Sequence, residues 1–379
     1  MSSKAVKPKN NSARRYTLSE EEAKLLLHFR ETGTILPQFL LKSDINAAKI
    51  RNKAKELNMK YKEAVNELTN ASQRIDLLCE LKDVKPGEIK IAPKGGVESE
   101  SVAVAVASDW HVEERVDAET VNHLNEFNPD IAKRRIRRFF QKIVFLTELS
   151  RGGTKIETLI LALLGDLISG FIHEEGMESN YMAPLPAIRL LQGELIAGIN
   201  FLKEYGGFER IYIPCSFGNH GRTTKKTRYG TAADNSYEQH MYFTLKNLYE
   251  NDPVVEFKID SSYLTYVTVF DKYVLRFHHG DSIRYAGGIG GITIPVNKAI
   301  AQWNKSRTAY LDVFGHYHQM LDGGKFISNG SIIGFNAYAL GIKASYEEPK
   351  QAFFLVDKNR GKTAVHPIFV EIKNFLEGE

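Results

Sequence analysis

The sequence predicts an α/β protein, because short apolar runs alternate with stretches of helical periodicity along most of its length. Five apolar runs have the length of buried strands: residues 102–106, 158–164, 211–217, 273–277 and 311–314. Helical stretches at 131–149 and 185–205 separate the first three runs. Strands that alternate with helices in this way are typical of α/β domains.

A second, smaller domain is expected before residue 95. Pro86-Gly87 and Gly95-Gly96 interrupt the pattern, which favours a domain boundary there. We expect a flexible basic tail over residues 1–15, a helical domain over 16–95 and a catalytic domain over 96–379. Ser19 and Glu22 form a capping box for the first helix. The helical domain could be a helix-turn-helix unit or a plain three-helix cap.

Composition places the chain among soluble globular proteins, since 43% of its 379 residues are hydrophobic and 25% are charged. There is no stretch of ~18 consecutive apolar residues, and the polar N-terminus lacks the apolar core of a secretory signal. Cys79 and Cys215 are the only cysteines, too few for a disulfide framework. We therefore expect a cytoplasmic protein that does not associate with membranes.

The net charge of +4 is unevenly distributed along the chain. Residues 1–90 contain 18 Lys and Arg against 12 Asp and Glu, so the remainder carries a balance of −2. A basic segment of this kind favours a polyanionic partner, although solvated helix faces commonly look the same. Nucleic-acid contact and a plain solvated surface are both open for this segment.

The informative feature of the sequence is the set of residues at the end of each apolar run. Side chains of metal-ligand type stand directly after all five: Ser108-Asp109-Trp110-His111, Gly165-Asp166, Gly218-Asn219-His220, His278-His279-Gly280 and Gly315-His316-Tyr317-His318. Ligands of α/β sheets bind at the carboxyl ends of the strands, where the loops converge. We therefore expect these side chains to meet at one site.

The types of side chain indicate the class of ion. Imidazole, carboxylate and amide groups without thiolates are typical of manganese, iron or zinc sites. One ion needs about three or four such groups, and more are available, which favours two divalent ions. Manganese is favoured, with iron, zinc, nickel or magnesium as alternatives. The predicted ligands are Asp109, His111, Asp166, Asn219, His279, His316 and His318.

Taken in order, the motifs Asp-x-His, Gly-Asp, Gly-Asn-His, His-Gly and Gly-His-x-His resemble those of the calcineurin-like metallophosphoesterase superfamily. The resemblance covers residues 100–370 and implies a two-sheet β-sandwich flanked by helices. The superfamily includes DNA-repair nucleases, phosphoprotein phosphatases and cyclic-nucleotide phosphodiesterases. The segment 169–174 is similar to stretches in its phage and prophage branch, which implies a bacterial or phage-infected host cell.

The resemblance also implies a role for each residue. The first metal would be held by Asp109, His111 and His318, the second by Asn219, His279 and His316, with Asp166 bridging both. A hydroxide that bridges the two metals would attack phosphorus, and His220 would protonate the leaving oxygen. Such a mechanism needs no covalent enzyme intermediate.

Two positions leave alternatives open. Members of the superfamily often carry Asp or Glu directly after Gly-Asn-His, whereas this chain has Gly221. The tuning of His220 is therefore open, or Asp234 or Glu238 supplies the carboxylate. The pair His278-His279 offers two imidazoles. We assign His279 because it directly precedes the glycine, while the preceding histidine would point to the opposite face of its strand.

A basic loop after His220 is the candidate for substrate contact. A loop of this kind would neutralise the backbone phosphates that flank a scissile one, although a solvated loop has the same composition. His173 could line the substrate cleft or be solvated. The predicted substrate-binding residues are Arg222, Lys225, Lys226, Arg228 and His173.

The predicted function is dinuclear-metal-dependent hydrolysis of phosphodiesters, with DNA as the favoured substrate and partner. One alternative is a phosphatase, nucleotide pyrophosphatase or protein phosphatase that acts on small or protein substrates. The other is a non-catalytic scaffold or accessory subunit that retains the fold, which the full ligand set disfavours. The oligomeric state, the mode of cleavage and the choice between DNA and RNA are not determined by the sequence.

Overall fold

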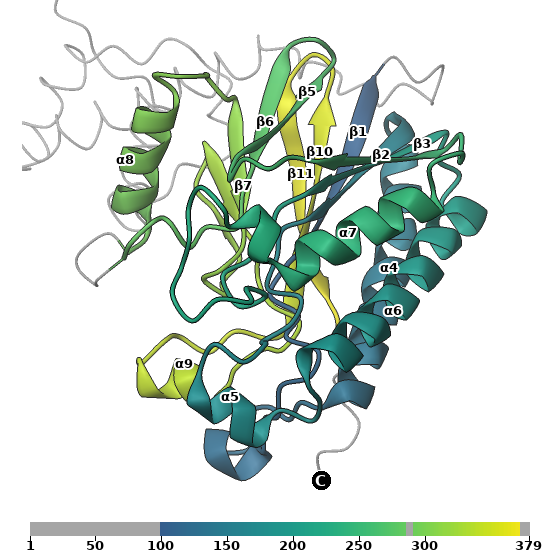
Figure 1. Ribbon diagram of the computed structural model, residues 1–379. Coiled ribbons are helices and arrows are strands. Elements are labelled where there is room, and N and C mark those ends of the chain that lie inside the picture. The colour runs from purple at the N-terminus through teal and green to yellow at the C-terminus, as the bar shows by residue number, and fades with distance from the viewer. Residues whose placement is uncertain (1–98, 286–290, 372–379) are drawn as a thin grey trace, which may run out of the picture. The chain divides into compact units, whose positions relative to one another are not determined.

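The computed structural model describes residues 99–285 and 291–371, and the predicted tail and helical domain lie outside the described residues. The described residues form a mixed α/β fold in which helices flank two mixed sheets (Figure 1). The predicted α/β class and the flanked two-sheet arrangement are confirmed for this part of the chain.

The first sheet has the strand order β11-β10-β1-β2-β3-β4. Its strands are β1 (Glu100–Ala107), β2 (Lys155–Leu163), β3 (Arg210–Cys215), β4 (Val255–Ile259), β10 (Lys350–Asp357) and β11 (Gly361–Phe369). The four strands β1 to β4 are parallel, whereas β10 and β11 extend the sheet antiparallel. The carboxyl ends of β1, β2 and β3 therefore lie along one edge.

The second sheet has the order β5-β6-β7-β9-β8. Its strands are β5 (Thr265–Val269), β6 (Tyr273–Phe277), β7 (Leu311–Phe314), β8 (Leu321–Asp322) and β9 (Phe326–Ser328). Strands β6, β7 and β9 are parallel neighbours, and β5 and β8 pair antiparallel at the two margins. The loops after β6, β7 and β9 consequently leave the sheet at the same edge.

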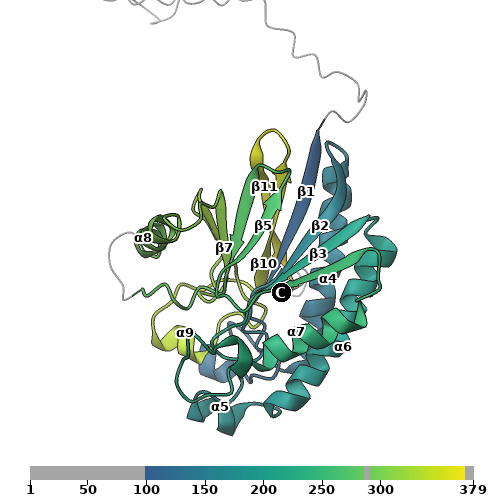
Figure 2. The ribbon, with the colours of Figure 1, turned by 45° about the horizontal axis from the view of Figure 1, so that its top comes forward.

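The longer helices cover the outer faces of the two sheets, whereas the two shortest lie beyond the ends of the strands (Figure 1). The helices are α4 (Pro129–Arg151), α5 (Glu174–Ser179), α6 (Pro184–Tyr205), α7 (Tyr237–Leu248), α8 (Thr293–Trp303) and α9 (Ala337–Gly341), with short 3-10 turns at Ala118–Val121 and Ala233–Asn235. Figure 2 shows α4, α6 and α7 on one side of the strands and α8 on the other. Among residues 99–285 and 291–371, no helix combines the length and apolar character needed to span a bilayer.

The strand β1 shows why the sequence folds in these layers. Its alternate residues face two different cores: Val104 packs between the sheets with Leu275 and Val313, whereas Ala105 packs with Phe139 toward the helices. A strand that is buried on both faces reads as a continuous apolar run rather than as an alternating one. Burial on both faces holds the start of the ligand-bearing loops rigidly in place.

Candidate metal centre

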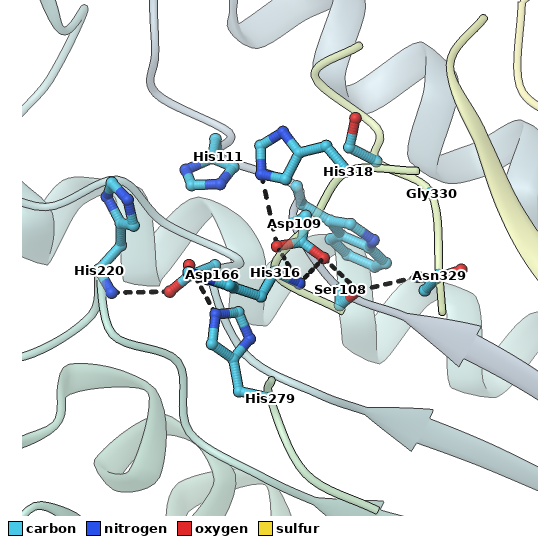
Figure 3. A network of polar contacts seen from close by, with 12 residues as sticks. Ser108, Asp109, His111, Asp166, His220, His279, His316, His318, Asn329 and Gly330 are labelled. Carbon is cyan, nitrogen blue, oxygen red and sulfur yellow. Dashed lines mark hydrogen bonds and ion pairs between the residues drawn. The ribbon is translucent and has the colours of Figure 1, made fainter. Parts of the chain in front are cut away.

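The loops that follow β1, β2, β3, β6 and β7 meet at one place, as predicted from the motifs (Figure 3). Backbone hydrogen bonds join them side by side: the N–H of Asp109 donates to the carbonyl of Gly165, and the N–H of Gly315 donates to the carbonyl of His279. The N–H of Trp110 also donates to the carbonyl of Asp166, at 2.8 Å. The positions of the ligand-bearing residues are therefore set by the backbone as well as by the side chains.

Six of the predicted ligands gather into two groups, each with one aspartate and two histidines. The groups are Asp109–His111–His318 and Asp166–His279–His316, and the candidate ligand atoms within each group lie within 4.8 Å of one another. These residues are contributed by loops up to 209 positions apart in the chain. The two aspartates and two of the histidines are fully or almost fully buried.

The seventh predicted ligand, Asn219, joins the second group. Its Oδ1 lies 3.1 Å from Nε2 of His279, and the same Nε2 lies 2.9 Å from Oδ2 of Asp166. An amide oxygen and a carboxylate oxygen thus converge on one imidazole nitrogen. Such a set of oxygen and nitrogen donors suits a divalent transition metal.

The backbone at the site is strained in a repeated way. Five predicted ligands have positive φ, a conformation that costs a side-chain-bearing residue about 1 kcal/mol or more. These residues are Asp109 (φ 57), His111 (φ 47), Asp166 (φ 50), His316 (φ 70) and His318 (φ 54). Five of the eleven side-chain-bearing residues with positive φ in the described part of the chain are thus predicted ligands, and strain of this kind is common at functional sites.

The glycines of the Gly-Asp and Gly-Asn-His motifs allow two loops to come close together. A Cβ on Gly165 would overlap the backbone of Gly218, and a Cβ on Gly218 would overlap the carboxylate of Asp166. Gly165 also has a φ of +83°, which disfavours any side chain. The two motifs therefore need glycine because their backbones lie in contact at the site.

Hydrogen bonds on the far side of each imidazole fix its orientation. Nδ1 of His279 lies 2.8 Å from the carbonyl of Leu164, which can only accept, so Nδ1 carries a proton and Nε2, which faces Asp166 and Asn219, is the nitrogen that a metal would take once the ring is neutral. Nδ1 of His111 lies 2.8 Å from Oγ of Ser169, and that hydroxyl donates to Glu114 at 2.8 Å. Nε2 of His111 is buried without a partner. An unpaired buried nitrogen among carboxylates fits a metal ligand.

The carboxylate of Asp109 is held by a similar set of donors. The N–H of His316 lies 3.0 Å from both carboxylate oxygens, and Oγ of Ser108 donates to Oδ2 at 2.5 Å. Nδ2 of Asn329 in turn donates to Oγ of Ser108 at 2.9 Å. Nε2 of His318 lies 3.4 Å from Oδ1, on the open side of the carboxylate (Figure 3).

The pKa values of the two groups shift in the same pattern. Burial would raise the pKa of Asp166, but His279 and His220 outweigh it, so that pKa lies well below its usual range. Burial would lower the pKa of His279, but Asp166 outweighs it, and the pKa lies well above its usual value. Burial and the neighbouring His279 lower the pKa of His316 to about 4. The second group therefore favours one positive charge beside its carboxylate.

The first group repeats this pattern. Despite burial, a hydrogen bond with His318 keeps the pKa of Asp109 below its usual range, and the same contact raises the pKa of His318. Burial and the neighbouring His220 hold the pKa of His111 well below its usual value. Each group thus combines an ionised carboxylate with a neutral imidazole that has a free lone pair, as cation binding requires.

His220 lies beside both groups, and a backbone carbonyl rather than a carboxylate accepts from its ring. Its backbone N–H donates to Oδ1 of Asp166 at 2.7 Å, and its ring nitrogen Nδ1 lies 3.1 Å from the carbonyl oxygen of Ser169. Two alternatives were open for this ring, and in the structure the Ser169 carbonyl, rather than Asp234 or Glu238, lies against Nδ1. The ring lies 4.9 Å from that of His111.

The assignment of His279 rather than His278 to the site agrees with the geometry. His278 faces the other side of β6, where its ring stacks on Phe314 at 5.1 Å and lies 3.5 Å from Asp312. Asp312 is occupied by a bidentate ion pair with Arg276. His278 is thus part of a buried polar cluster under α8 and not of the two groups.

The predicted substrate-binding residues differ in exposure and in their distance along the chain from His220. Arg222 is partly buried, and its guanidinium donates to the carbonyls of Asn219 and Thr224, so it stabilises the loop. Lys225, Lys226 and Arg228 are exposed. The ring of His173 lies 5.4 Å from that of His220, which places it at the site. Their contact with a substrate stays a prediction.

Several residues that hold the site were not identified in this role from the sequence. Ser169, Glu113, Glu114 and Glu238 bond the ligand-bearing loops without belonging to any of the motifs. Asn329 reaches Asp109 through Ser108 from a loop more than two hundred residues away. Their only signal in the sequence is a polar residue inside a buried stretch, which does not identify its partner.

Comparison with known proteins gives similarity to solved structures alone. No protein-family model matches the sequence, and no curated protein matches it. A dimetal phosphatase from Danio rerio is similar over 71% of this chain and 99% of its own, with 10% identity and a TM-score of 0.34. The sulfate thiohydrolase SoxB from Thermus thermophilus is similar over 73% of this chain and 58% of its own, with 12% identity and a TM-score of 0.29.

Proposed function

We propose that this protein is a dinuclear-metal-dependent phosphodiesterase that acts on nucleic acid. The observation that carries the proposal is the pairing of two aspartate–histidine groups around His220 at one edge of the two sheets. The order of the motifs, which resembles that of calcineurin-like metallophosphoesterases, supports the same activity. We assign Asp109, His111 and His318 to one ion and Asn219, His279 and His316 to the other, with Asp166 between them.

The chemistry that the metals would supply is general for such sites. A bound pair of divalent cations neutralises charge on a phosphate and acidifies water at neutral pH. The chain contributes the fixed donor set, in which buried hydrogen bonds orient His111, His279 and Asp109. This orientation matters because a site whose ligands are loosely held binds metal more weakly.

His220 is the candidate catalytic residue for the leaving group. The Ser169 carbonyl can only accept, so Nδ1 of His220 carries a proton and donates to it. This bond persists whether Nε2 is protonated or not, so the ring can keep its orientation while Nε2 gives up a proton. A proton delivered to the leaving oxygen contributes about 10²–10⁴-fold to the rate.

Nucleic acid is the proposed substrate class because the loop that directly follows His220 carries exposed basic side chains. Lys225, Lys226 and Arg228 follow it within eight residues and are exposed. Exposed cations in a loop that starts at His220 would pair with the phosphates that flank the scissile one in a polymer. A small diester has no flanking phosphates, so the loop would contribute nothing to its hydrolysis.

The test compares variants on two classes of substrate, a small diester and nucleic acid, in the presence of Mn²⁺. We expect His220→Ala to retain both metals and to lose about 10²–10⁴-fold in kcat on a chromogenic diester and on labelled DNA and RNA. Lys225→Glu combined with Lys226→Glu should leave the chromogenic diester unaffected and reduce cleavage of nucleic acid, more strongly at low salt.

The matched control is His240→Ala, which removes an exposed histidine of α7 whose side chain lies outside the two groups. It should retain wild-type rates on both substrates. Hydrolysis that is unchanged in His220→Ala would remove the catalytic assignment. Equal losses on both substrates in the charge-reversed variant would contradict the nucleic-acid assignment.

A further inference from the structure

The buried carboxylate of Glu238 joins two of the loops that carry predicted ligands. Glu238 lies in the first turn of α7 and is 0% exposed. Its Oε1 accepts the N–H of Leu167 at 2.6 Å, and its Oε2 accepts the N–H of Gly218 at 2.8 Å. Leu167 directly follows Asp166, and Gly218 directly precedes Asn219, so one side chain ties together the loops of two predicted ligands.

The geometry calls for a carboxylate rather than for another polar group. Two backbone N–H groups from different loops point at one buried position, and each needs its own acceptor. An ionised carboxylate offers two acceptor oxygens and no donor, whereas the amide of glutamine would direct its NH₂ at one of the two N–H groups. Hydrogen bonds to an ionised acceptor are also stronger than those to a neutral one.

Gly221 leaves the room that this carboxylate occupies. A Cβ on Gly221 would lie 2.8 Å from Cγ and Cδ of Glu238 and 2.9 Å from its Oε2. Gly221 is not among the glycines with positive φ, so its backbone does not itself require glycine. The missing side chain after His220 is thus explained by the helix α7, which brings a carboxylate to the same place.

We propose that Glu238 is a positioning residue that sets the spacing of the Asp166 and Asn219 loops for one of the two metals. The inference rests on the proposed function for the presence of a metal pair. Its effect should be larger on the group that contains Asn219, since Asp109 and His111 are oriented by other residues, Ser108 and Ser169. A residue that merely stabilised the fold would not distinguish between the two groups.

The experiment is a calorimetric titration of the metal-free full chain with Mn²⁺, supported by metal analysis after gel filtration. We expect Glu238→Gln and Glu238→Ala to weaken one of the two binding steps by about 10–100-fold and the other less, because Asn219 belongs to one group alone whereas Asp166 lies between the two ions. His279→Ala and His111→Ala show which step belongs to which group. The more strongly weakened step should be the one that His279→Ala removes.

A relocated carboxylate provides a stricter test. In the Glu238→Ala background, Gly221→Asp places a short carboxyl side chain into the vacated space, next to the two N–H groups. We expect this double variant to recover most of the affinity that Glu238→Ala loses. The matched control is Glu194→Gln, which removes a largely buried glutamate of α6 that pairs with Arg137, away from the ligand loops.

The outcomes separate the inference from the proposed function, because binding is measured without substrate. Unchanged binding in both Glu238 variants, equal weakening of both steps, or no recovery in the double variant would overturn the inference. If Glu238→Ala does not fold, Glu238→Gln carries the test, since it retains one acceptor. A wild type that binds two Mn²⁺ but hydrolyses no phosphodiester would overturn the proposed function alone.

Discussion

At the scale of single residues, the site depends on side chains that orient other side chains. Ser169 illustrates this, since its hydroxyl lies 2.8 Å from Nδ1 of His111 and donates to Glu114. Because the hydroxyl uses its only proton toward the carboxylate, it accepts the Nδ1 proton of the imidazole. Nε2 of His111 is left with a free lone pair, which a metal ligand requires.

We predict that Ser169→Ala weakens the first metal group. Without the hydroxyl, neither the tautomer nor the ring angle of His111 is fixed, so the affinity for one Mn²⁺ should fall by about 10–100-fold. The backbone N–H of Ser169, which donates to Glu113, is unaffected by the substitution. Titration with Mn²⁺ measures the effect.

The control for this prediction is Ser179→Ala. The hydroxyl of Ser179 donates to a carbonyl of its own helix, α5, so its removal should leave Mn²⁺ affinity at the wild-type level. Equal affinities of Ser169→Ala and the wild type would show that His111 does not need the serine for its orientation.

At the scale of elements, the long helix α4 supports the first sheet and the loop after β1 from outside and contributes no predicted ligand. It begins at Asn128, whose Oδ1 accepts the N–H groups of Asp130 and Ile131 at 3.0 Å each, and Pro129 occupies the first helical position. Its buried face, which includes Phe139 and Phe140, packs edge-on against Trp110. Cap and packing together position the helix behind the loop after β1.

We predict that Asn128→Ala lowers the free energy of unfolding by about 1 kcal/mol without altering hydrolysis. The substitution leaves two N–H groups at the helix start without their acceptor, but it touches none of the predicted ligands. Urea denaturation of the metal-loaded protein measures the change. Asn128→Ser, which can also cap, should restore most of the loss, and a loss of Mn²⁺ binding would contradict the separation of helix and site.

At the scale of the whole molecule, metal and protons compete for the same buried groups. The raised pKa of His279 stabilises the metal-free fold below pH 6.5, and this contribution is lost as pH rises through the pKa of the folded protein. Burial raises the pKa of Glu113 to about 8 and that of Glu238 to about 7, so their ionisation in the fold is also unfavourable as pH rises. Metal ligands, by contrast, bind in their deprotonated form.

We therefore predict opposite pH responses of the two states. Between about pH 6 and about pH 9, the Tm of the EDTA-treated protein should fall, and the increase in Tm on adding Mn²⁺ should grow. Scanning calorimetry across this range measures both. Binding of Mn²⁺ should also release protons, which titrations in buffers of different ionisation enthalpy detect. A Mn²⁺ effect that shrinks as pH rises would contradict coordination by His279.

The residues that gather at the site can be identified from the sequence alone. Buried strands give continuous apolar runs, and the ligand types directly after them are readable without coordinates, so the α/β class and the six residues that gather into two groups were predicted. Strand β10 was missed although it contains the apolar stretch 352–356, because no ligand motif stands after it. Periodicity shows that a strand exists but not its neighbours.

The residues that hold the ligands in place can be identified only in the folded structure. Glu238 lies in a helix 20 residues after Gly218, and Asn329 lies 221 residues after Ser108, yet both bond at the site. Hydrogen-bond partners of this kind are chosen by the packing of sheets and helices, which places distant segments together. A single sequence does not show such pairings, because the residue type of a buried glutamate does not reveal which groups it contacts.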